Sequence, residues 1–466
     1  MDIYSLFIDG DWIENKFDDY IEVENPGTKE IIGKVPAAKE EDVNKAVEGA
    51  LRAFPKWKNL EAEERIKYVQ GMYEYFKKNV DEIAKTVHLE LGCPPDFAKQ
   101  RHVEGYFGNI ENFIKLASEY EFTEFYEGYE IYKDPVGIIG ALTPWNFPFG
   151  QIVKKVIPAL LMGNVVILKP SQRTPLTAYF WAEAAHEVGL PDGVFQLVTG
   201  RGAEVGNILA THKDVDMISF TGSTKGGIEI SKLAADTVKR VSLELGGKSP
   251  GILLEGADYK KALKSILGTV YLNMGQSCSA KTRLLAPRKD KEEIEKLLID
   301  ITQEFKFGSS QDETSDVGAL QSKKQLDKVS GYVEVGKDEA QLLHQGQGYE
   351  GEGYYFPPTI FTEVDQNAKI AQEEIFGPVL SIIYYDDVDE AIEIANNTIY
   401  GLSGMIFGPE EEARKVAKEI RTGQLQINDA PFTHNAPFGG FKQSGIGREG
   451  SIYGLEEYVE IKTIFV

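Results

Sequence analysis

Cysteine is scarce in this sequence. Cys93 and Cys278 are the two cysteines among 466 residues, too few for a disulfide framework, and such scarcity is typical of proteins from the reducing cytoplasm, where we expect this chain to reside. Six scattered histidines and two distant cysteines lack the spacing of a zinc site, so we expect no metal centre. Cys93 lies in LGCPP, where a helix is expected to end, and we interpret it as a buried structural thiol.

Long apolar runs and an excess of positive charge are missing too. No apolar run approaches the ~20 residues that span a membrane, and the N-terminal stretch has no basic region followed by an apolar one, so we expect neither a membrane segment nor a secretory signal. The 73 acidic residues outnumber the 50 basic ones, for a formal charge of −23. A field of that sign repels nucleic acids and anionic membranes, so we expect neither as a partner.

The sequence does contain strong hydrophobic periodicity, in a chain long enough for two or three domains. Apolar side chains recur every three or four residues through 40–118, which predicts helices. Residues 5–13 predict a hairpin that turns at Asp9-Gly10. Residues 121–134 alternate aromatic and acidic side chains, which predicts an exposed two-stranded ribbon. Because such a ribbon is marginal alone, we expect it to join the sheet of another subunit.

From residue 136 onward, short β-branched runs alternate with helical ones. Strands are predicted at 136–142, 164–170, 193–200, 215–223 and 239–247, and helices at 149–162, 174–188, 202–210 and 224–235. A second alternation starts after residue 247. Alternating strands and helices favour a parallel sheet with helices on both faces. The predicted fold class is therefore α/β, with two Rossmann-like, doubly wound parallel-sheet domains and a small β ribbon for oligomerisation.

Cys278 is the first candidate for chemistry. It lies in NMGQSCS, after a predicted helix, and Gly275 breaks the helical pattern before it. A thiol on a loop after a packed helix can act as a nucleophile. A single cysteine is also commonly a small buried hydrophobe, and taken alone this residue leaves both interpretations open.

Three polar residues at strand ends are further candidates. Glu244 ends an apolar strand before two glycines, in surroundings that would raise its pKa toward that of a general base. Asn146, in TPWNFP, is able to donate an N–H to an oxyanion. Lys169 lies at the carboxyl end of a strand, where parallel sheets bind ligands. Each also has a plain structural explanation: a salt-bridged strand end, a turn residue and a surface cation.

Glycines cluster in the loops after the predicted strands of the first α/β region. They are Gly200, Gly202, Gly206, Gly222, Gly226 and Gly227. Glycines there let backbone N–H groups and a helix N-terminus approach a phosphate. Their spacing is not G-x-G-x-x-G, so turn geometry alone explains each of them equally well.

Together, the motifs resemble those of the aldehyde dehydrogenase superfamily, of the NAD(P)-dependent hydrolytic type. They stand in the family's order: TPWNFP (143–148), LKPS (168–171), FTGST (220–224), LELGGKSP (243–250), GQSC (275–278), EEIFGPV (373–379) and PFGGFKQSGIGRE (437–449). Cys278 follows Glu244 by 34 positions, the separation that the family uses. The resemblance extends over essentially the whole chain.

The resemblance implies a catalytic set. Cys278 matches the nucleophile, and Asn146 together with the backbone N–H of Cys278 matches the oxyanion hole. Glu244 matches the general base that activates water to hydrolyse the thioester. Lys155 and Glu449 match positions that relay the proton.

The resemblance also implies a dinucleotide site. The matching positions are Trp145, Lys169, Ser171, Gln172, Gly222, Ser223, Gly227, Glu374 and Phe376. Many NAD-selective members carry a glutamate where this chain has Gln172. An amide keeps the hydrogen bonding and removes the repulsion of a 2′-phosphate. We therefore expect NAD or NADP as cofactor, with NADP tolerated.

The substrate tunnel is matched by Phe147, Gly150, Ser277, Ser279 and Phe432, and also by Lys154. Ser277 and Phe147 do not supply the arginine and tyrosine of members that use phosphorylated aldehydes, which argues against glyceraldehyde phosphate. Gly150 and the small serines indicate width near the thiol. A broad range of aliphatic or aromatic aldehydes is therefore the expected substrate.

The resemblance implies a division of the chain and an oligomer. The expected parts are 1–118 with 135–246 as the NAD(P)-binding domain, 247–445 as the catalytic domain, and 119–134 with 446–466 as the oligomerisation segment. The ribbon and the terminal strand, 457–464, are expected to pair across subunits in a homodimer or homotetramer.

Two other functions remain as alternatives. A CoA-acylating semialdehyde dehydrogenase would use the same thiol, but such members usually lack the glutamate that Glu244 matches. A catalytically inactive structural homologue is the second, and the intact set of Cys278, Glu244 and Asn146 argues against it.

Overall fold

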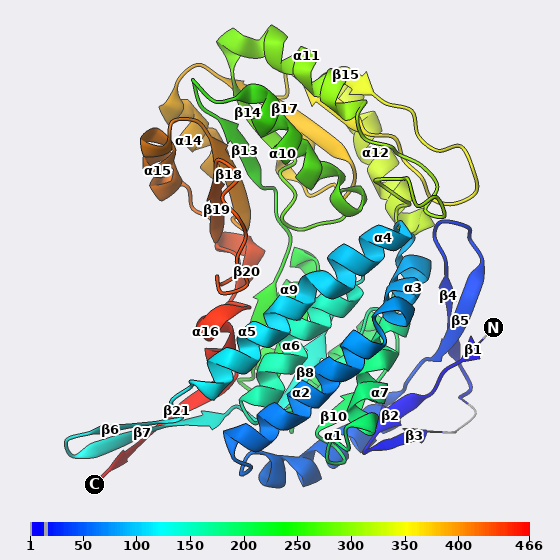
Figure 1. Ribbon diagram of the computed structural model, residues 1–466, viewed down its shortest axis with the longest axis vertical. Helices are drawn as coiled ribbons and strands as arrows, with labels where there is room; N and C mark the ends of the chain where they lie inside the picture. The colour runs from blue at the N-terminus through cyan, green and yellow to red at the C-terminus, as the bar shows by residue number, and fades with distance from the viewer. Residues whose placement is uncertain (1, 14–16) are drawn as a thin grey trace.

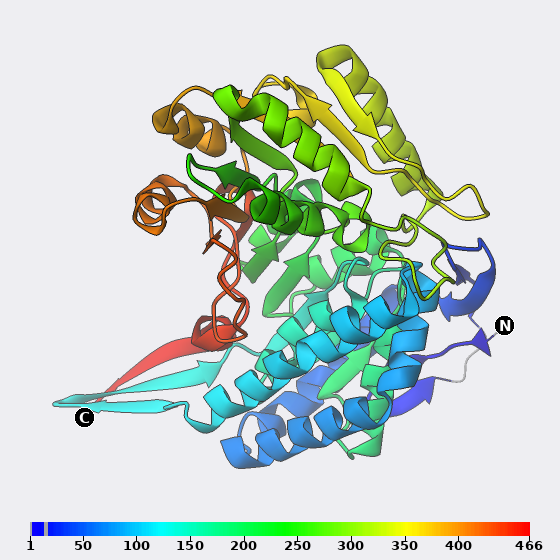
Figure 2. The same cartoon turned by 45° about the horizontal axis from the view of Figure 1, so that its top comes forward.

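The computed structural model describes residues 2–13 and 17–466. Two α/β lobes lie one above the other, and a narrow β ribbon projects from the lower lobe with the C-terminus at its tip (Figure 1). The lower lobe is formed by the first half of the chain together with a return segment near the C-terminus. The upper lobe begins at residue 250, and the turned view shows the return segment running down beside it (Figure 2).

The lower lobe contains an eight-stranded sheet in the order β20-β12-β11-β8-β9-β10-β2-β3. Its strands are β2 (Leu6–Ile8), β3 (Asp11–Ile13), β8 (Ile138–Leu142), β9 (Val165–Lys169), β10 (Phe195–Leu197), β11 (Met217–Thr221), β12 (Arg240–Glu244) and β20 (Gly445–Ile446). The five from β8 to β12 are parallel, as predicted, and β2-β3 is the predicted hairpin. The order reverses between β8 and β11, which is where a doubly wound sheet binds its ligand.

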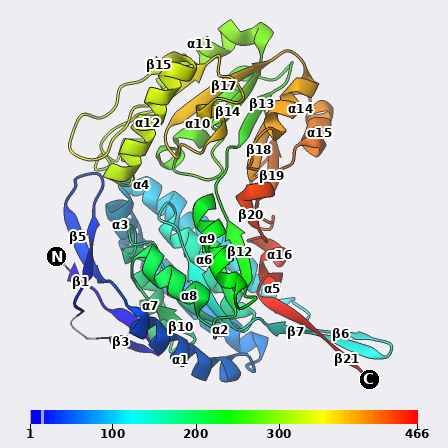
Figure 3. The same cartoon turned by 180° about the vertical axis from the view of Figure 1, so that it is seen from behind.

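Helices cover both faces of this sheet, so the central strands are apolar on both sides. One face carries α2 (Ala62–Lys78), α5 (Phe107–Ser118), α6 (Pro148–Leu161) and α7 (Tyr179–Glu187). The other carries α1 (Glu40–Trp57), α8 (Asn207–Thr211) and α9 (Thr224–Ala235), which Figure 3 shows from behind. The 40–118 region is helical as predicted and also contains α3 (Val80–Leu91), α4 (Pro95–Phe97), a π-helix, η1 (Ala98–Val103), and a 3-10 turn, η2 (Glu104–Tyr106).

The upper lobe has a seven-stranded sheet in the order β15-β16-β17-β14-β13-β18-β19, parallel except for β15. Its strands are β13 (Pro250–Leu253), β14 (Arg283–Pro287), β15 (Gln341–Gln345), β16 (Thr359–Thr362), β17 (Val379–Tyr385), β18 (Ser403–Phe407) and β19 (Gln424–Ile427). Its helices are α10 (Tyr259–Tyr271), α11 (Lys291–Thr302), α12 (Lys323–Glu339), α13 (Lys369–Gln372), α14 (Val388–Asn396) and α15 (Glu410–Glu419). The second predicted α/β domain is therefore present, with a hydrophobic core of its own.

A small sheet at the N-terminal edge was not predicted. It joins β1 (Asp2–Ile3), β5 (Ile31–Pro36) and β4 (Tyr20–Glu24). These strands are short and partly exposed, so their apolar residues do not form the long runs that a buried strand needs.

The ribbon departs from the expectation. β6 (Thr123–Tyr126) and β7 (Tyr129–Pro135) form the predicted hairpin, but β21 (Val459–Phe465) pairs with β7 of the same chain along its whole length. β21 uses one edge for β7 of its own chain and lies at the margin of this sheet, so pairing of its other edge across subunits stays a prediction. β20 pairs with β12, and α16 (Ser451–Glu456) packs on α5 and α6, so of 446–466 only β21 lies in the ribbon.

Within the described ranges, no helix is long and apolar enough to cross a membrane.

Candidate active site

A cavity lies where the strand order of the first sheet reverses. The loops that follow β8 and β11 diverge there, and the cavity between them has a volume of about 170 Å³. It is lined by Pro144, Trp145, Asn146, Gln151, Thr221, Gly222, Ser223, Leu245, Gly246, Cys278, Gln325, Lys328, Glu374 and Phe376. The first nine belong to the lower lobe and the last five to the upper lobe, so the site lies between the domains.

The loop that carries Cys278 has an unusual backbone. After α10, Asn273 and Met274 have φ values of 50° and 60°, and Gly275 has a φ of 70°. A Cβ on Gly275 would overlap the carbonyl of Gly377, so glycine is required at this position. Consecutive left-handed residues are costly, and they occur where a surrounding structure fixes a functional group. The thiol thus has a defined position at the cavity.

Two hydrogen bonds connect Asn146 to the loop that carries Cys278. Its Nδ2 donates to the carbonyl of Gln276 at 3.0 Å, and its own carbonyl accepts from Nδ2 of Asn273 at 2.8 Å. The side chain is buried. One hydrogen of the amide remains without an acceptor among the described residues, which leaves a fixed donor beside Cys278.

Glu244 ends β12 in a dry environment. Its side chain is 3% exposed, and neither carboxyl oxygen has a hydrogen-bond partner among the described residues. A Cβ on Gly439 would come within 2.8 Å of Oε1, so a glycine there makes room for the carboxyl group. Burial, followed by the negative charge of Glu449, raises the pKa of Glu244 well above its ordinary value. The group thus has the elevated pKa of a general base.

The pKa of the Cys278 thiol is also raised. Burial, followed by the charge of Glu374, raises the pKa of Cys278 to about 12, and the ammonium of Lys154 opposes this rise. The thiol is therefore the resting form near neutral pH. Nucleophilic attack requires that this proton be removed. Burial raises the pKa of two nearby carboxyl groups, Glu244 and Glu374, but Glu374 already accepts from Gly247 N, which leaves Glu244 as the candidate proton acceptor.

The two expected relay residues lie together. Lys155 Nζ is 2.7 Å from Oε1 of Glu449, and both side chains are buried. Lys155 also donates to Ser219 Oγ at 3.3 Å, and Ser219 accepts from the hydroxyl of Tyr458 at 3.1 Å. Ser219 and Tyr458 were not identified from the sequence, because nothing local distinguishes them from ordinary core residues.

Five predicted cofactor residues line the cavity. The rings of Trp145 and Phe376 meet edge to face with centroids 5.4 Å apart. Ser223 caps α9 by accepting from Gly226 N at 3.1 Å, next to Gly222. Backbone donors at a helix N-terminus suit a pyrophosphate, and aromatic faces suit a nicotinamide.

Glu374 is the fifth of these residues. Its Oε1 accepts from Gly247 N at 3.1 Å, and a Cβ on Gly246 would lie 2.9 Å from its carboxylate. The glycine pair therefore brings the backbone close to this carboxylate. A carboxylate accepts from ribose hydroxyls, so the residues present fit a dinucleotide such as NAD.

Four other predicted cofactor residues lie outside the cavity lining. Lys169, Ser171 and Gln172 follow β9, and burial lowers the pKa of Lys169 to about 8. Gln172 Oε1 accepts from Gly202 N at 3.4 Å. Gly227 packs on Leu245, where a Cβ would come within 2.5 Å of the side chain. Their roles toward a cofactor stay predictions.

The expected width at Gly150 is wrong. The ring of Tyr106, from η2, occupies the space that a Cβ on Gly150 would need, so the missing side chain accommodates an aromatic wall. Beside it, His102 stacks on Phe147 with ring centroids 4.8 Å apart. No pattern in the sequence predicts that residues 102–106 lie here, because an irregular π-helix and a 3-10 turn determine their position.

The other expected tunnel residues, Ser277, Ser279 and Phe432, lie outside the cavity lining. Ser277 is buried, and its hydroxyl lies 3.2 Å from that of Ser279. Phe432 is 61% exposed and packs edge to face on His434, on a surface loop. Neither serine nor Phe432 lines the cavity, so their contact with a substrate stays a prediction.

Helix α12 contributes two residues that the sequence did not reveal. Gln325 Nε2 donates to the carbonyl of Phe376 at 2.8 Å, and Lys328 Nζ donates to that of Glu374 at 2.8 Å. They hold a turn in which Phe376 has a φ of 63°. No motif marks them, since they lie on an ordinary amphipathic helix far away in sequence.

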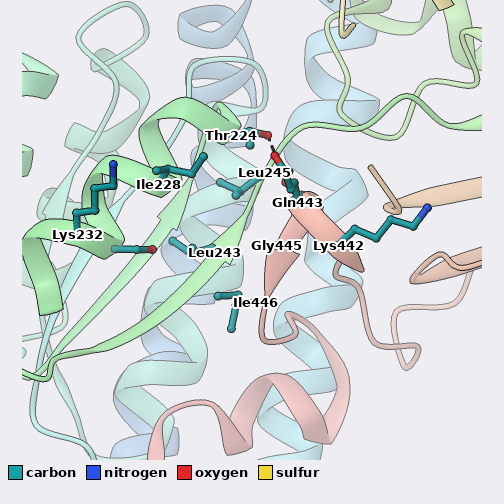
Figure 4. Close-up of a pocket in the computed structure, with 10 residues that line it drawn as sticks. Thr224, Ile228, Lys232, Leu243, Leu245, Lys442, Gln443, Gly445 and Ile446 are labelled. Atoms are coloured by element: carbon teal, nitrogen blue, oxygen red, sulfur yellow. Dashed lines mark hydrogen bonds between the residues drawn. The ribbon is translucent and has the colours of Figure 1, made fainter. Parts of the chain in front are cut away.

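A second hollow lies on the other side of Leu245, beside α9, with a volume of about 280 Å³ (Figure 4). Ile228, Leu243 and Ile446 give it an apolar lining, and Thr224 donates to the carbonyl of Gln443 across one end at 3.3 Å. It contains none of the candidate catalytic groups, so the interdomain cavity is the candidate active site.

No cluster of histidine, cysteine, aspartate and glutamate that could hold a metal ion occurs within residues 2–13 and 17–466.

Comparison with known proteins agrees with this geometry. A model of the aldehyde dehydrogenase family matches residues 12–464. A putative aldehyde dehydrogenase from Staphylococcus aureus is 42% identical over 468 aligned positions, which cover 99% of this chain and 98% of that protein.

Two solved structures are similar throughout. Aldehyde dehydrogenase C from Pseudomonas syringae, solved as a variant with NAD+ and octanal, is 40% identical with a TM-score of 0.97, over 99% of this chain and 96% of that one. An aldehyde dehydrogenase from Mycobacterium tuberculosis, solved with NAD+, is 38% identical with a TM-score of 0.97, over 100% and 98%. With matches of this extent, the chain belongs to the aldehyde dehydrogenase family.

Proposed function

We propose that this aldehyde dehydrogenase uses NAD to oxidise an aldehyde to a free carboxylic acid, through a thioester on Cys278. The observation that carries the proposal is the dry carboxyl group of Glu244, which lies close enough to influence the pKa of the Cys278 thiol, while the Asn146 amide lines the same cavity as that thiol. The similar structures that contain NAD+ support the choice of cofactor.

The first step joins the substrate to the protein. Glu244 accepts the thiol proton, and the sulfur of Cys278 bonds to the carbonyl carbon to give a thiohemiacetal. The aldehyde oxygen becomes negative, and the free N–H of Asn146 and the backbone N–H of Cys278 stabilise it. Asn146 needs no reorganisation for this, because Gln276 already holds its amide.

Oxidation then leaves a thioester on Cys278. A bound NAD supplies the acceptor for the hydride that leaves the former aldehyde carbon. Trp145 and Phe376 would hold the nicotinamide, and Glu374 would bind its ribose. The Gln325 and Lys328 contacts keep the loop of Glu374 and Phe376 in place.

Hydrolysis releases the acid. Glu244 first releases the proton that it took from the thiol and then removes a proton from a water molecule. The water attacks the thioester carbon, and the sulfur of Cys278 leaves. The proton passes toward Glu449 and Lys155, whose buried pair lies close enough to influence the charge of Glu244. A hydrolytic base distinguishes this route from CoA acylation, which transfers the acyl group to a thiol instead.

Further proposals concern the cofactor and the setting of the enzyme. NADP is tolerated because Gln172 is neutral. The enzyme forms a homodimer or homotetramer, as its exposed ribbon favours, and works in the cytoplasm, as its two free thiols favour. Its substrate is an aldehyde. The broad range expected from the width at Gly150 is not part of the proposal, since Tyr106 fills that space.

Product analysis tests the proposed function. With an aldehyde and NAD, the wild-type protein should form one free acid per NADH in the absence of CoA. Cys278→Ala should lower this rate by roughly 10³-fold or more and still bind NAD, because the change removes the nucleophile and leaves the nucleotide cleft intact. Acid formation that depends on CoA would favour the acylating alternative. Absence of any oxidation by the folded wild-type protein would favour the inactive homologue.

A further inference from the structure

Lys154 is a largely buried cation whose ammonium is too far from its carboxylate partner for a hydrogen bond. Its Nζ is 3.6 Å from Oε2 of Glu449, which is too long for a hydrogen bond, whereas Lys155 takes the other oxygen at 2.7 Å. The centroid of the Phe438 ring lies 4.2 Å from the Lys154 ammonium, and the Lys154 side chain is 14% exposed. A buried charge without a close counter-ion is unfavourable, so this ammonium is suited to an anionic ligand.

The charges of the site leave this ammonium without compensation. Glu449 is shared by two lysines, and Lys155 takes its nearer oxygen, so one carboxylate faces two ammonium groups. Burial lowers the pKa of Lys154, but the charges of Glu449, Tyr106, Glu244 and Cys278 together outweigh burial and raise the pKa overall, so Lys154 stays protonated. The cluster of Lys154, Lys155 and Glu449 therefore has one positive charge in excess, and Lys154 lies close enough to influence the pKa of the Cys278 thiol.

Tyr106 adds a hydroxyl next to this charge. Its ring lies over Gly150, one helical turn before Lys154 on the same face of α6. The hydroxyl group makes no hydrogen bond to any residue that the structure describes. The charges of Lys154 and Cys278 both act on the pKa of Tyr106, so the three groups lie close together.

We propose that Lys154 and Tyr106 form a subsite for a carboxylate on the aldehyde, so that the preferred substrates are oxo acids with an aldehyde at the other end. This rests on the proposed oxidation at Cys278. The carboxylate accepts from the ammonium and the phenolic hydroxyl and supplies the missing negative charge. Tyr106 limits the width of the site, and Lys154 selects the charge.

Paired substrates of similar length test the subsite. 4-Oxobutanoate carries the carboxylate, and pentanal replaces it with an apolar end. The wild-type kcat/KM should favour the oxo acid at least tenfold. In Lys154→Met this ratio should fall at least tenfold, mainly through KM, and Lys154→Arg should keep most of it. Tyr106→Phe should lower the ratio about threefold. Lys213→Met, at an exposed lysine, is the control for net charge and should keep it.

The outcomes separate the subsite from the catalytic proposal. An equal loss for both aldehydes in Lys154→Met would overturn the subsite, because Lys154 would then act on the thiol or on Glu244. Equal use of both aldehydes by the wild type would overturn it and leave the proposed function intact. If neither is oxidised, the proposed function fails, and protection of Cys278 from iodoacetamide by 4-oxobutanoate decides the subsite. Protection in the wild type and not in Lys154→Met supports it, and no protection in the wild type overturns it.

Discussion

Two acidic side chains in the site, Cys278 and Glu244, have raised pKa values, and this constrains the chemistry. Cys278 and Glu244 are both raised in pKa first by burial, and each is further raised by a carboxylate, Glu374 and Glu449 respectively. A charged thiolate and a charged carboxylate side by side would be unfavourable in so dry a site. One proton shared between the two groups is the arrangement that this environment favours, and it makes Glu244 the natural acceptor for the thiol proton.

Glu244→Gln separates the two half-reactions. The variant cannot accept a proton from water, so hydrolysis should slow by about 10²–10⁴-fold. NADH should still form in a burst of up to one per active site, but more slowly than in the wild type, because Glu244 also accepts the thiol proton. Stopped-flow absorbance measures both phases. In the wild type, the slow phase should accelerate as pH rises through the raised pKa of Glu244, because the ionised form is the base. A variant whose steady-state rate keeps the wild-type pH profile would exclude Glu244 as the base.

The same pKa shift predicts a change in stability. Since the folded pKa of Glu244 exceeds its unfolded value of about 4.3, its contribution to stability is fully present below that pH and is lost as pH rises through the folded pKa. Glutamine does not titrate, so the free energy of unfolding of Glu244→Gln should exceed that of the wild type increasingly toward pH 8. Urea denaturation at several pH values measures this, and Glu460→Gln, at an exposed glutamate, is the matched control.

Gln172 determines the response to a 2′-phosphate, if the predicted cofactor role is right. The wild type should turn over with NADP at millimolar concentration. Gln172→Glu should raise KM for NADP at least tenfold, because the new carboxylate repels the phosphate, and change KM for NAD much less. Initial rates with the two cofactors give the comparison. Failure of the wild type to use NADP would refute the argument from Gln172.

At the scale of elements, the contact between η2 and α6 is a close fit. Gly150→Ala would place a methyl group in the ring of Tyr106, and overpacking of this kind costs about 1–3 kcal/mol. Thermal unfolding should show a lower midpoint, and the displaced ring should lower kcat/KM.

The double variant Tyr106→Ala with Gly150→Ala is the control. It removes the ring that meets the new methyl group, so the added alanine should cost less in the Tyr106→Ala background than in the wild type. Equal costs in the two backgrounds would mean that the two residues do not interact.

The elements that the sequence predicted well are those with long apolar patterns. β8 and β9 are buried along their whole length, β11 and β12 are buried over three consecutive residues each, and α1 and α10 have clear amphipathic faces. The small β1-β5-β4 sheet and the π-helix η1 lack such patterns, so they were missed. The site was predictable where a motif marks it, as with Cys278. Gln325, Lys328 and Tyr106 were not, because tertiary packing alone brings them there.

At the scale of the molecule, the site needs both domains. The lower lobe supplies the oxyanion donor and, at the end of β12, the base, and the upper lobe supplies the thiol and the carboxylate Glu374. Asn273 and Gln276 form hydrogen bonds with Asn146 across the boundary between the lobes. These bonds therefore connect the two lobes at the catalytic groups. A change in how the lobes meet would therefore disturb the thiol and the oxyanion donor together.

The exposed ribbon is the expected site of association between subunits. Its three strands belong to one chain, so any oligomer must use its outer edges or faces rather than the β7–β21 pairing. Phe125 on the outer strand is 75% exposed, and Phe465 is 82% exposed. Apolar side chains on an open edge favour association, so the wild type should sediment as a dimer or tetramer at micromolar concentration. Phe125→Lys should shift it toward smaller species, whereas Val238→Lys, at a site 92% exposed on the lower lobe, should not. A wild-type monomer at that concentration would show that the ribbon does not bind another subunit.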